Sequence, residues 1–113
     1  MIIDSHCHLT YEPMSSSLEE TIKRANKDGI EFLLTISTED KSFRNILDIL
    51  DKYKCVYGSY GIHPHEAKQH KGIKFENIIE KVKQNKKIIG IGETGLDFYY
   101  NHSEKKDQIE SFL

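Results

Sequence analysis

The sequence has few cysteines and no long apolar runs. It contains only two cysteines in 113 residues, Cys7 and Cys55, too few for a disulfide framework but compatible with a reducing cytoplasm. No apolar run is long enough to span a bilayer. The first residues, Met1-Ile2-Ile3-Asp4, lack the basic and apolar regions of a signal peptide. We therefore expect a cytoplasmic protein with no membrane partner.

The chain also lacks an excess of positive charge. The sequence has 16 Lys and Arg residues and 18 Asp and Glu residues, which gives a formal net charge of -2. No global field attracts nucleic acid, so a nucleic-acid substrate would be held locally by a metal and a few donors. Hydrophobic residues make up 37% of the sequence and charged residues 30%. This is the ordinary composition of one globular domain.

Strand and helix patterns alternate four times along the chain. Apolar runs predict a first strand that ends near His8 and further strands over residues 32–36, 56–60 and 88–92. The run over 32–36 is typical of a strand covered on both faces. Apolar residues at helical spacing predict a helix over 17–28 with a Ser17 and Glu20 capping box, one from Thr38, one with Phe75, Ile78, Ile79 and Val82 on one face, and one capped by Ser103 with Ile109, Phe112 and Leu113 inward. This alternation predicts right-handed parallel βαβ units in an α/β fold, with helices on one outer surface.

The first strand ends in Asp4-Ser5-His6-Cys7-His8. Residues two apart in a strand point the same way, so Asp4, His6 and His8 share a face. Two imidazoles about 7 Å apart along a strand can converge on one divalent cation, and a carboxylate beside them can orient them. The alternative is two exposed histidines beside a turn. Cys7 faces the opposite side and is expected to be a small buried hydrophobe, as is Cys55. His70 lies in a Lys-rich polar stretch and is expected to be solvated.

A second motif, Gly61-Ile62-His63-Pro64-His65, follows the third strand. Pro64 restricts the backbone and presents both imidazoles in a rigid loop. The loop lies on the side of a parallel sheet where ligands bind. We therefore favour substrate or phosphate contact for His63 and His65, with metal binding as a second interpretation and a plain exposed turn as the alternative.

A third motif, Gly90-Ile91-Gly92-Glu93-Thr94-Gly95-Leu96-Asp97, has the spacing of neither a P-loop nor a dinucleotide fingerprint. Its first two glycines suit close backbone approach. Glu93 ends a strand, where a carboxylate can bridge two cations, although it also fits a surface charge. We expect Asp97 to shape the loop. The aromatic residues that follow either pack on a helix or stack on a base, and Tyr99 is the candidate for substrate stacking.

The sequence resembles the TatD family of metal-dependent deoxyribonucleases, which are amidohydrolase-like TIM barrels, in three segments: Ile2-Ile3-Asp4-Ser5-His6-Cys7-His8-Leu9, Gly61-Ile62-His63-Pro64-His65 and Gly92-Glu93-Thr94-Gly95-Leu96-Asp97-Phe98-Tyr99. The resemblance implies that His6 and His8 bind one divalent metal and that Glu93, the catalytic carboxylate, bridges it to a second. It also implies that His63 and His65 line the substrate side. Mg, Mn and Zn are not distinguished by this ligand set.

The resemblance further implies that residues 1–113 form a single incomplete domain, about four β/α units from the N-terminal half of a (β/α)8 TIM barrel. Family members carry two more histidines and an aspartate on later strands, and a full barrel has roughly 250 residues. The expected function is metal-dependent hydrolysis of DNA phosphodiester bonds by the full-length parent. The alternatives are a catalytically incompetent half-barrel or assembly module, and an amidohydrolase-type esterase or amidase. An open barrel edge favours self-association.

Overall fold

The computed structural model describes all 113 residues and is built around a four-stranded parallel sheet in the order β1-β2-β3-β4. The strands are β1 (Ile2–Cys7), β2 (Ile30–Thr35), β3 (Val56–Tyr60) and β4 (Ile88–Ile91). The first strand ends one residue before His8, and the other three begin and end within two residues of their predicted ranges. Sequential parallel order requires a crossover between each pair of neighbours, as the alternating pattern predicted.

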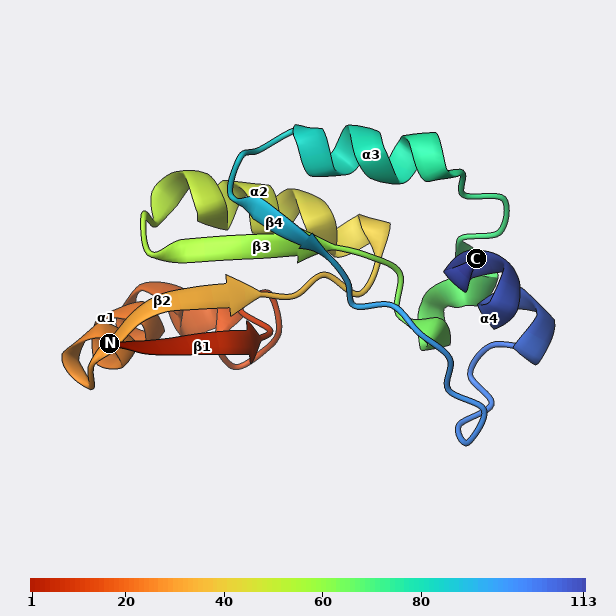
Figure 1. The fold of residues 1–113 in the computed structure, drawn as a ribbon. Helices are drawn as coiled ribbons and strands as arrows, with labels where there is room; N and C mark the ends of the chain where they lie inside the picture. The colour runs from red at the N-terminus through yellow and green to blue at the C-terminus, as the bar shows by residue number, and fades with distance from the viewer.

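Three crossover helices cover one face of this sheet (Figure 1). They are α1 (Leu18–Lys27), α2 (Asp40–Lys52) and α3 (Phe75–Lys83), with a short 3-10 turn η1 (Ser15–Ser17) before the first. A second 3-10 segment and a last helix lie beyond the carboxyl ends of the strands (Figure 1), and these are η2 (Pro64–Gln69) and α4 (Lys105–Phe112). The expected single helical layer is therefore present.

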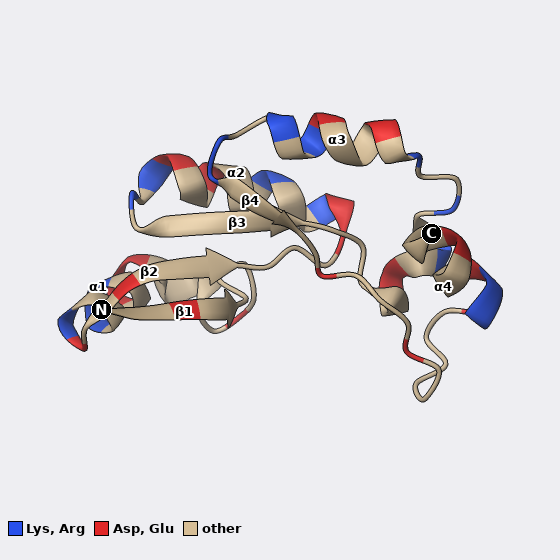
Figure 2. Cartoon of the chain, viewed as in Figure 1, with Lys and Arg blue, Asp and Glu red and all other residues tan.

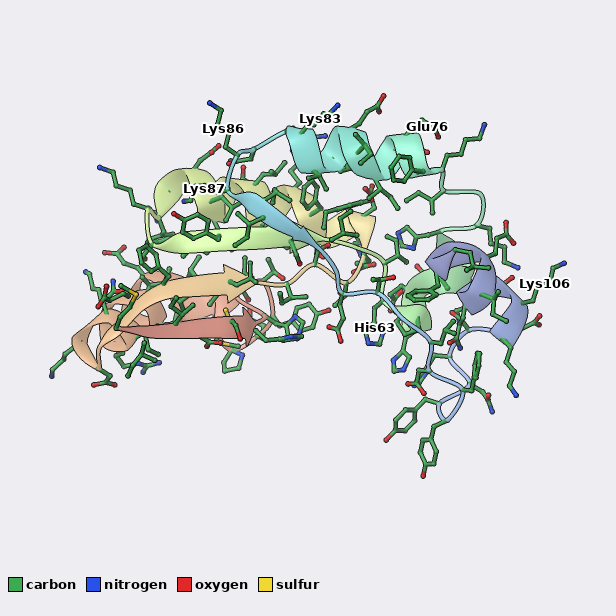
Figure 3. All side chains as sticks on the ribbon, viewed as in Figure 1. His63, Glu76, Lys83, Lys86, Lys87 and Lys106 are labelled. Carbon is green, nitrogen blue, oxygen red and sulfur yellow. The ribbon has the colours of Figure 1, made fainter.

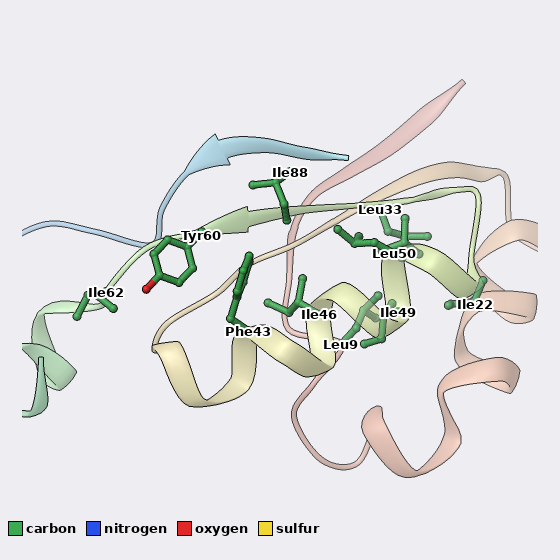
Figure 4. Packing of buried hydrophobic residues seen from close by; sticks show 11 residues of the cluster. Leu9, Ile22, Leu33, Phe43, Ile46, Ile49, Leu50, Tyr60, Ile62 and Ile88 are labelled. Atoms are coloured by element: carbon green, nitrogen blue, oxygen red, sulfur yellow. The ribbon is translucent and has the colours of Figure 1, made fainter. Parts of the chain in front are cut away.

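The hydrophobic core lies between the sheet and its helices (Figure 4). Phe43, Ile46 and Leu50 of α2 follow helical spacing and are at most 2% exposed. They pack against buried strand residues such as Val56 and Tyr60, and the Phe43 and Tyr60 rings meet edge to face at 4.6 Å. No residue after Ile88 belongs to the buried cluster. The body of the fold thus does not depend on α4 for its core.

The opposite face of the sheet is bare. Ile3, Ile89 and Ile91 are 55%, 60% and 55% exposed, and an apolar hollow of about 350 Å³ on this face includes Phe32 and Tyr57. The second strand reads in the sequence as covered on both faces, but only one face is covered here. This exposed interior is what four strands of an unclosed barrel leave open.

Charged residues lie mainly on the helices and connections, with both signs mixed (Figure 2). Asp4 and Glu31 are the only Asp, Glu, Lys or Arg residues in the four strands. This distribution agrees with the absence of a basic face in the sequence. None of the helices combines the length and apolar character that crossing a lipid bilayer requires.

The side chains predicted to cap or open three of the helices do not do so. Ser17 occupies the N-cap position of α1, as predicted, but its side chain does not cap the helix, because its Oγ donates to the Pro13 carbonyl at 3.2 Å. The second helix begins at Asp40, and the Thr38 hydroxyl instead bonds the Tyr11 hydroxyl at 2.5 Å. Ser103 does not cap α4, since Glu104 occupies the N-cap position. Spacing alone identified the helices but not the partners that side-chain oxygens choose.

Two predicted apolar faces are also corrected. Phe75 at the start of α3 is 69% exposed, although Ile78 and Val82 pack against the core. The predicted inward face of α4 points outward, with Ile109 42%, Phe112 49% and Leu113 95% exposed. Periodicity shows that residues share a face, but it does not show that the chain supplies a partner for that face.

Candidate metal centre

His6 and His8 converge where β1 ends, as the alternation predicted. Their ring centroids are 5.1 Å apart. The His8 Nδ1–H donates to the Ile36 carbonyl at 3.3 Å, so its Nε2 keeps a lone pair that can bind a cation. The Asp4 carboxylate forms no hydrogen bond with either ring and instead accepts the His6 backbone N–H at 3.1 Å. The carboxylate therefore fixes the main chain and does not orient an imidazole.

Main-chain hydrogen bonds fix the position of Glu93 just beyond β4. Its N–H donates to the Ser37 carbonyl at 2.7 Å, and the Gly92 N–H donates to the Tyr60 carbonyl at 2.9 Å. The Ser59 hydroxyl donates to the Gly92 carbonyl at 2.6 Å. The segment is held against β3 and the end of β2, which directs its carboxylate toward β1.

The Glu93 carboxylate lies among three imidazoles. Its Oε2 is 3.6 Å from His6 Nε2 and 3.9 Å from His8 Nε2, while its Oε1 is 3.6 Å from His63 Nε2. These separations are too long for hydrogen bonds. Atoms that each lie about 2.1 Å from one cation are themselves roughly 3 to 4 Å apart. The ligand atoms of His6, His8 and Glu93, all within 4.8 Å of one another, thus fit a divalent ion.

His63 presents a proton donor to the same cavity. Its Nδ1 accepts the His65 backbone N–H at 3.1 Å, so in the neutral ring the proton is on Nε2, facing Glu93 Oε1. Burial lowers the pKa of His63, and this effect is larger than the opposite effect of the Glu93 charge, which raises the pKa. The ring is located between η2 and the end of β3 (Figure 3). Its geometry suits hydrogen-bond donation to an anionic oxygen better than metal binding.

His65 is paired with Asp97. Its Nε2 lies 2.6 Å from Asp97 Oδ2, and this hydrogen bond lowers the pKa of Asp97. The other carboxylate oxygen accepts the backbone N–H groups of Tyr99 and Tyr100 at 3.0 and 3.1 Å. The prediction that Asp97 shapes the loop is confirmed, and its contact with His65 was not predicted.

A cavity of about 340 Å³ lies among the four imidazoles and the Glu93 carboxylate. It is lined by His6, His8, Tyr11, Thr38, His63, His65, Glu66 and Glu93. The sequence did not reveal Tyr11, whose ring stacks on His8 at 5.0 Å, because its contact depends on how the chain turns after β1. Tyr99 is 84% exposed and does not line the cavity, so a stacking role stays a prediction.

Two backbone segments approach closely, as predicted, but the glycine that allows this approach is Gly61 and not Gly90 or Gly92. A Cβ on Gly61 would lie 2.5 Å from the Gly92 carbonyl carbon and 2.8 Å from the backbone carbonyl oxygen of Glu93. A Cβ on Gly90 would meet nothing closer than Ser59 Cβ at 4.0 Å, and one on Gly92 would meet nothing within 4 Å. Only glycine at position 61 lets the Glu93 segment lie this close to β3.

Three other sequence assignments have clear outcomes. Burial raises the pKa of the Cys7 thiol to about 12, which agrees with its assignment as a hydrophobe and not a metal ligand. Cys55 also packs against the core. His70 was expected to be solvated, but its Nε2 accepts the Asp40 N–H at 3.2 Å and its Nδ1 faces the Glu66 carbonyl at 2.9 Å. Its place between η2 and α2 depends on tertiary contacts.

Comparison with known families decides what this arrangement is. Residues 3–113 match the model of the family described as TatD related DNase. The chain belongs to the TatD-related DNase family. It is 34% identical to an uncharacterized metal-dependent hydrolase of Buchnera aphidicola, over 98% of this chain and 45% of that protein. It is 28% identical to the 3'-5' ssDNA/RNA exonuclease TatD of Shigella flexneri, over 99% of this chain and 43% of that one.

A solved TatD homologue, YJJV from Escherichia coli K12, has the same fold. The TM-score is 0.82 at 24% identity, covering 98% of this chain and 43% of that chain. The four βα units are accordingly the N-terminal half of a TatD-type TIM barrel. The chain spans less than half the length of these TatD relatives.

Proposed function

We propose that this chain contributes part of a divalent-metal site to a hydrolase that cleaves phosphodiester bonds in DNA. The observation that supports the proposal most directly is the position of Glu93, with one carboxylate oxygen toward His6 and His8 and the other toward His63. The Shigella relative that is named as an exonuclease makes nucleic acid the first substrate to test.

In this proposal His6, His8 and Glu93 hold the metal, and the free Oε1 allows Glu93 to serve a second ion in the complete site. A bound divalent ion would activate water and neutralise charge on the phosphate. Mg, Mn and Zn all remain candidates. The Nε2–H of His63 donates to a phosphate oxygen, His65 contacts the substrate beside it, and Tyr99 stacks on a base.

We also propose a cytoplasmic location, because both cysteines are free thiols as a reducing compartment requires. The hydrolase function is tested by incubating the purified full-length parent with a single-stranded oligodeoxynucleotide and Mg²⁺ or Mn²⁺, because residues 1–113 supply only part of the proposed site. We expect metal-dependent cleavage that Glu93→Ala abolishes and that Glu76→Ala, a change at an exposed residue of α3, leaves intact. Equal cleavage by the Glu93→Ala variant would refute the assignment.

A catalytically incompetent half-barrel is the second candidate, because only three clustered ligand atoms are present. It predicts metal binding without cleavage of the oligonucleotide or of a panel of small esters and amides. Cleavage of an ester by the wild-type chain, with DNA untouched, would instead support the amidohydrolase-type activity.

The bare sheet face leads us to propose that residues 1–113 act as a single incomplete unit that self-associates. Burying Ile3, Ile89 and Ile91 against a second copy would remove apolar surface from water. We expect oligomers by analytical ultracentrifugation and predominantly monomers for Ile89→Lys. Ile109→Lys makes the same change at an exposed isoleucine on α4 and should leave the oligomers unchanged. A monomeric wild type at every concentration would contradict the proposal.

A further inference from the structure

Gln108 is the most completely bonded side chain of α4. It is 1% exposed. Its Oε1 accepts the Asp97 N–H at 2.8 Å, and its Nε2 donates to the carbonyls of Asp97 and Ser103, both at 2.9 Å. Both amide protons and the amide oxygen are therefore used, and the backbone of Asp97 is held from both sides.

The same segment also holds the backbone of His65. The Ser103 hydroxyl donates to the His65 carbonyl at 2.8 Å and accepts the Lys68 N–H at 3.1 Å. Since Gln108 bonds the Ser103 carbonyl, one side chain connects the two segments that carry His65 and Asp97. The 2.6 Å contact between the His65 ring and the Asp97 carboxylate lies between these fixed points.

Packing alone does not account for a buried glutamine at this position. The apolar residues of α4 point outward, and Ile109 is 42% exposed. The other buried residue of the helix, Asp107, bonds Lys71 at 2.9 Å. The helix thus docks on η2 through polar groups, and a buried amide that lost its partners would destabilise this docking.

We propose that Gln108 is a positioning residue that sets the place of the Asp97 carboxylate and thereby orients the His65 imidazole in the candidate site. The role of the oriented ring rests on the proposed function. Gln108 itself does not line the cavity. It acts by fixing the backbone of Asp97, whose carboxylate touches the ring.

The test uses NMR of the purified chain without metal or substrate. We expect Gln108→Met to raise the titration midpoint of the Asp97 carboxyl toward the ordinary 3.8, because the hydrogen bond to His65 weakens. The signal of the hydrogen-bonded His65 Nε2–H should be lost. Gln84→Met, the same change at an exposed residue, should leave both signals at their wild-type values.

A second variant covers the case in which methionine undocks α4. Gln108→Asn keeps the amide on a stem shorter by one methylene, so it cannot reach both backbone groups of Asp97, and the same upward shift is expected. Wild-type titration and an intact His65 signal in either folded variant would overturn the proposal. Since no turnover is measured, a chain that hydrolyses nothing leaves this test valid, and a negative result here leaves the role of Glu93 untouched.

Discussion

Glu93→Gln is expected to remove specific binding of a divalent ion by this chain. The change preserves shape but replaces a charged ligand oxygen 3.6 Å from His6 Nε2 by a neutral amide. Loss of a partner behind a ligand already costs about 10- to 100-fold in affinity, so loss of the ligand itself should cost about 100-fold or more. Isothermal titration calorimetry with Mn²⁺ and Zn²⁺ measures the difference directly.

The matched control is Glu76→Gln, which removes an exposed carboxylate on α3 (Figure 3). It should bind the ion as the wild type does. Wild-type affinity should weaken as the pH falls, because imidazole ligands must be deprotonated. Binding that survives in Glu93→Gln but disappears in His65→Ala would locate the metal at the other end of the cavity.

Gly61→Ala should destabilise the fold and weaken metal binding together. The added Cβ would lie 2.5 Å from the Gly92 carbonyl carbon, and the neighbour is backbone that cannot rotate away. Overpacking of this kind typically costs about 1 to 3 kcal/mol, measurable by urea denaturation. Displacement of Gly92 also moves Glu93 away from His6 and His8, so calorimetry should show a lower affinity in the folded variant.

Gly90→Ala provides the comparison within the same structural unit. Its Cβ would meet only Ser59 Cβ at 4.0 Å. With no clash, the loss of unfolded-state freedom should make this variant neutral or up to about 1 kcal/mol more stable. Equal destabilisation of both variants would mean that the close approach at Gly61 is not what holds the Glu93 segment.

The sequence predicted the strands and the convergence of His6 and His8 because both depend on local periodicity. Residues two apart in an extended strand share a face whatever surrounds them. Glu93 was also within reach of prediction, since the carboxyl ends of neighbouring parallel strands meet at one edge of a sheet.

The polar connections were beyond prediction from local patterns. Gln108 is one polar residue in a helix whose apolar spacing indicated a different inward face, and its partners lie 11 and 5 residues away in an irregular loop. Position 61 requires glycine because the backbone of Gly92 lies directly against it. This contact joins the ends of two different strands. His70 looked solvated because nothing nearby in the sequence shows that the N-terminus of α2 lies above it.

The polar docking of α4 divides the candidate site into parts of unequal local stability. His6, His8 and Glu93 are attached to the sheet, whose hydrogen-bonded strands share the buried cluster. Asp97 and the loop that carries Tyr99 and Tyr100 are attached to α4, a helix that contributes nothing to that cluster. Segments with few buried apolar contacts open at lower free energy than the core. The end of the candidate site that carries His6, His8 and Glu93 can therefore stay formed while the end that carries Asp97 opens and closes.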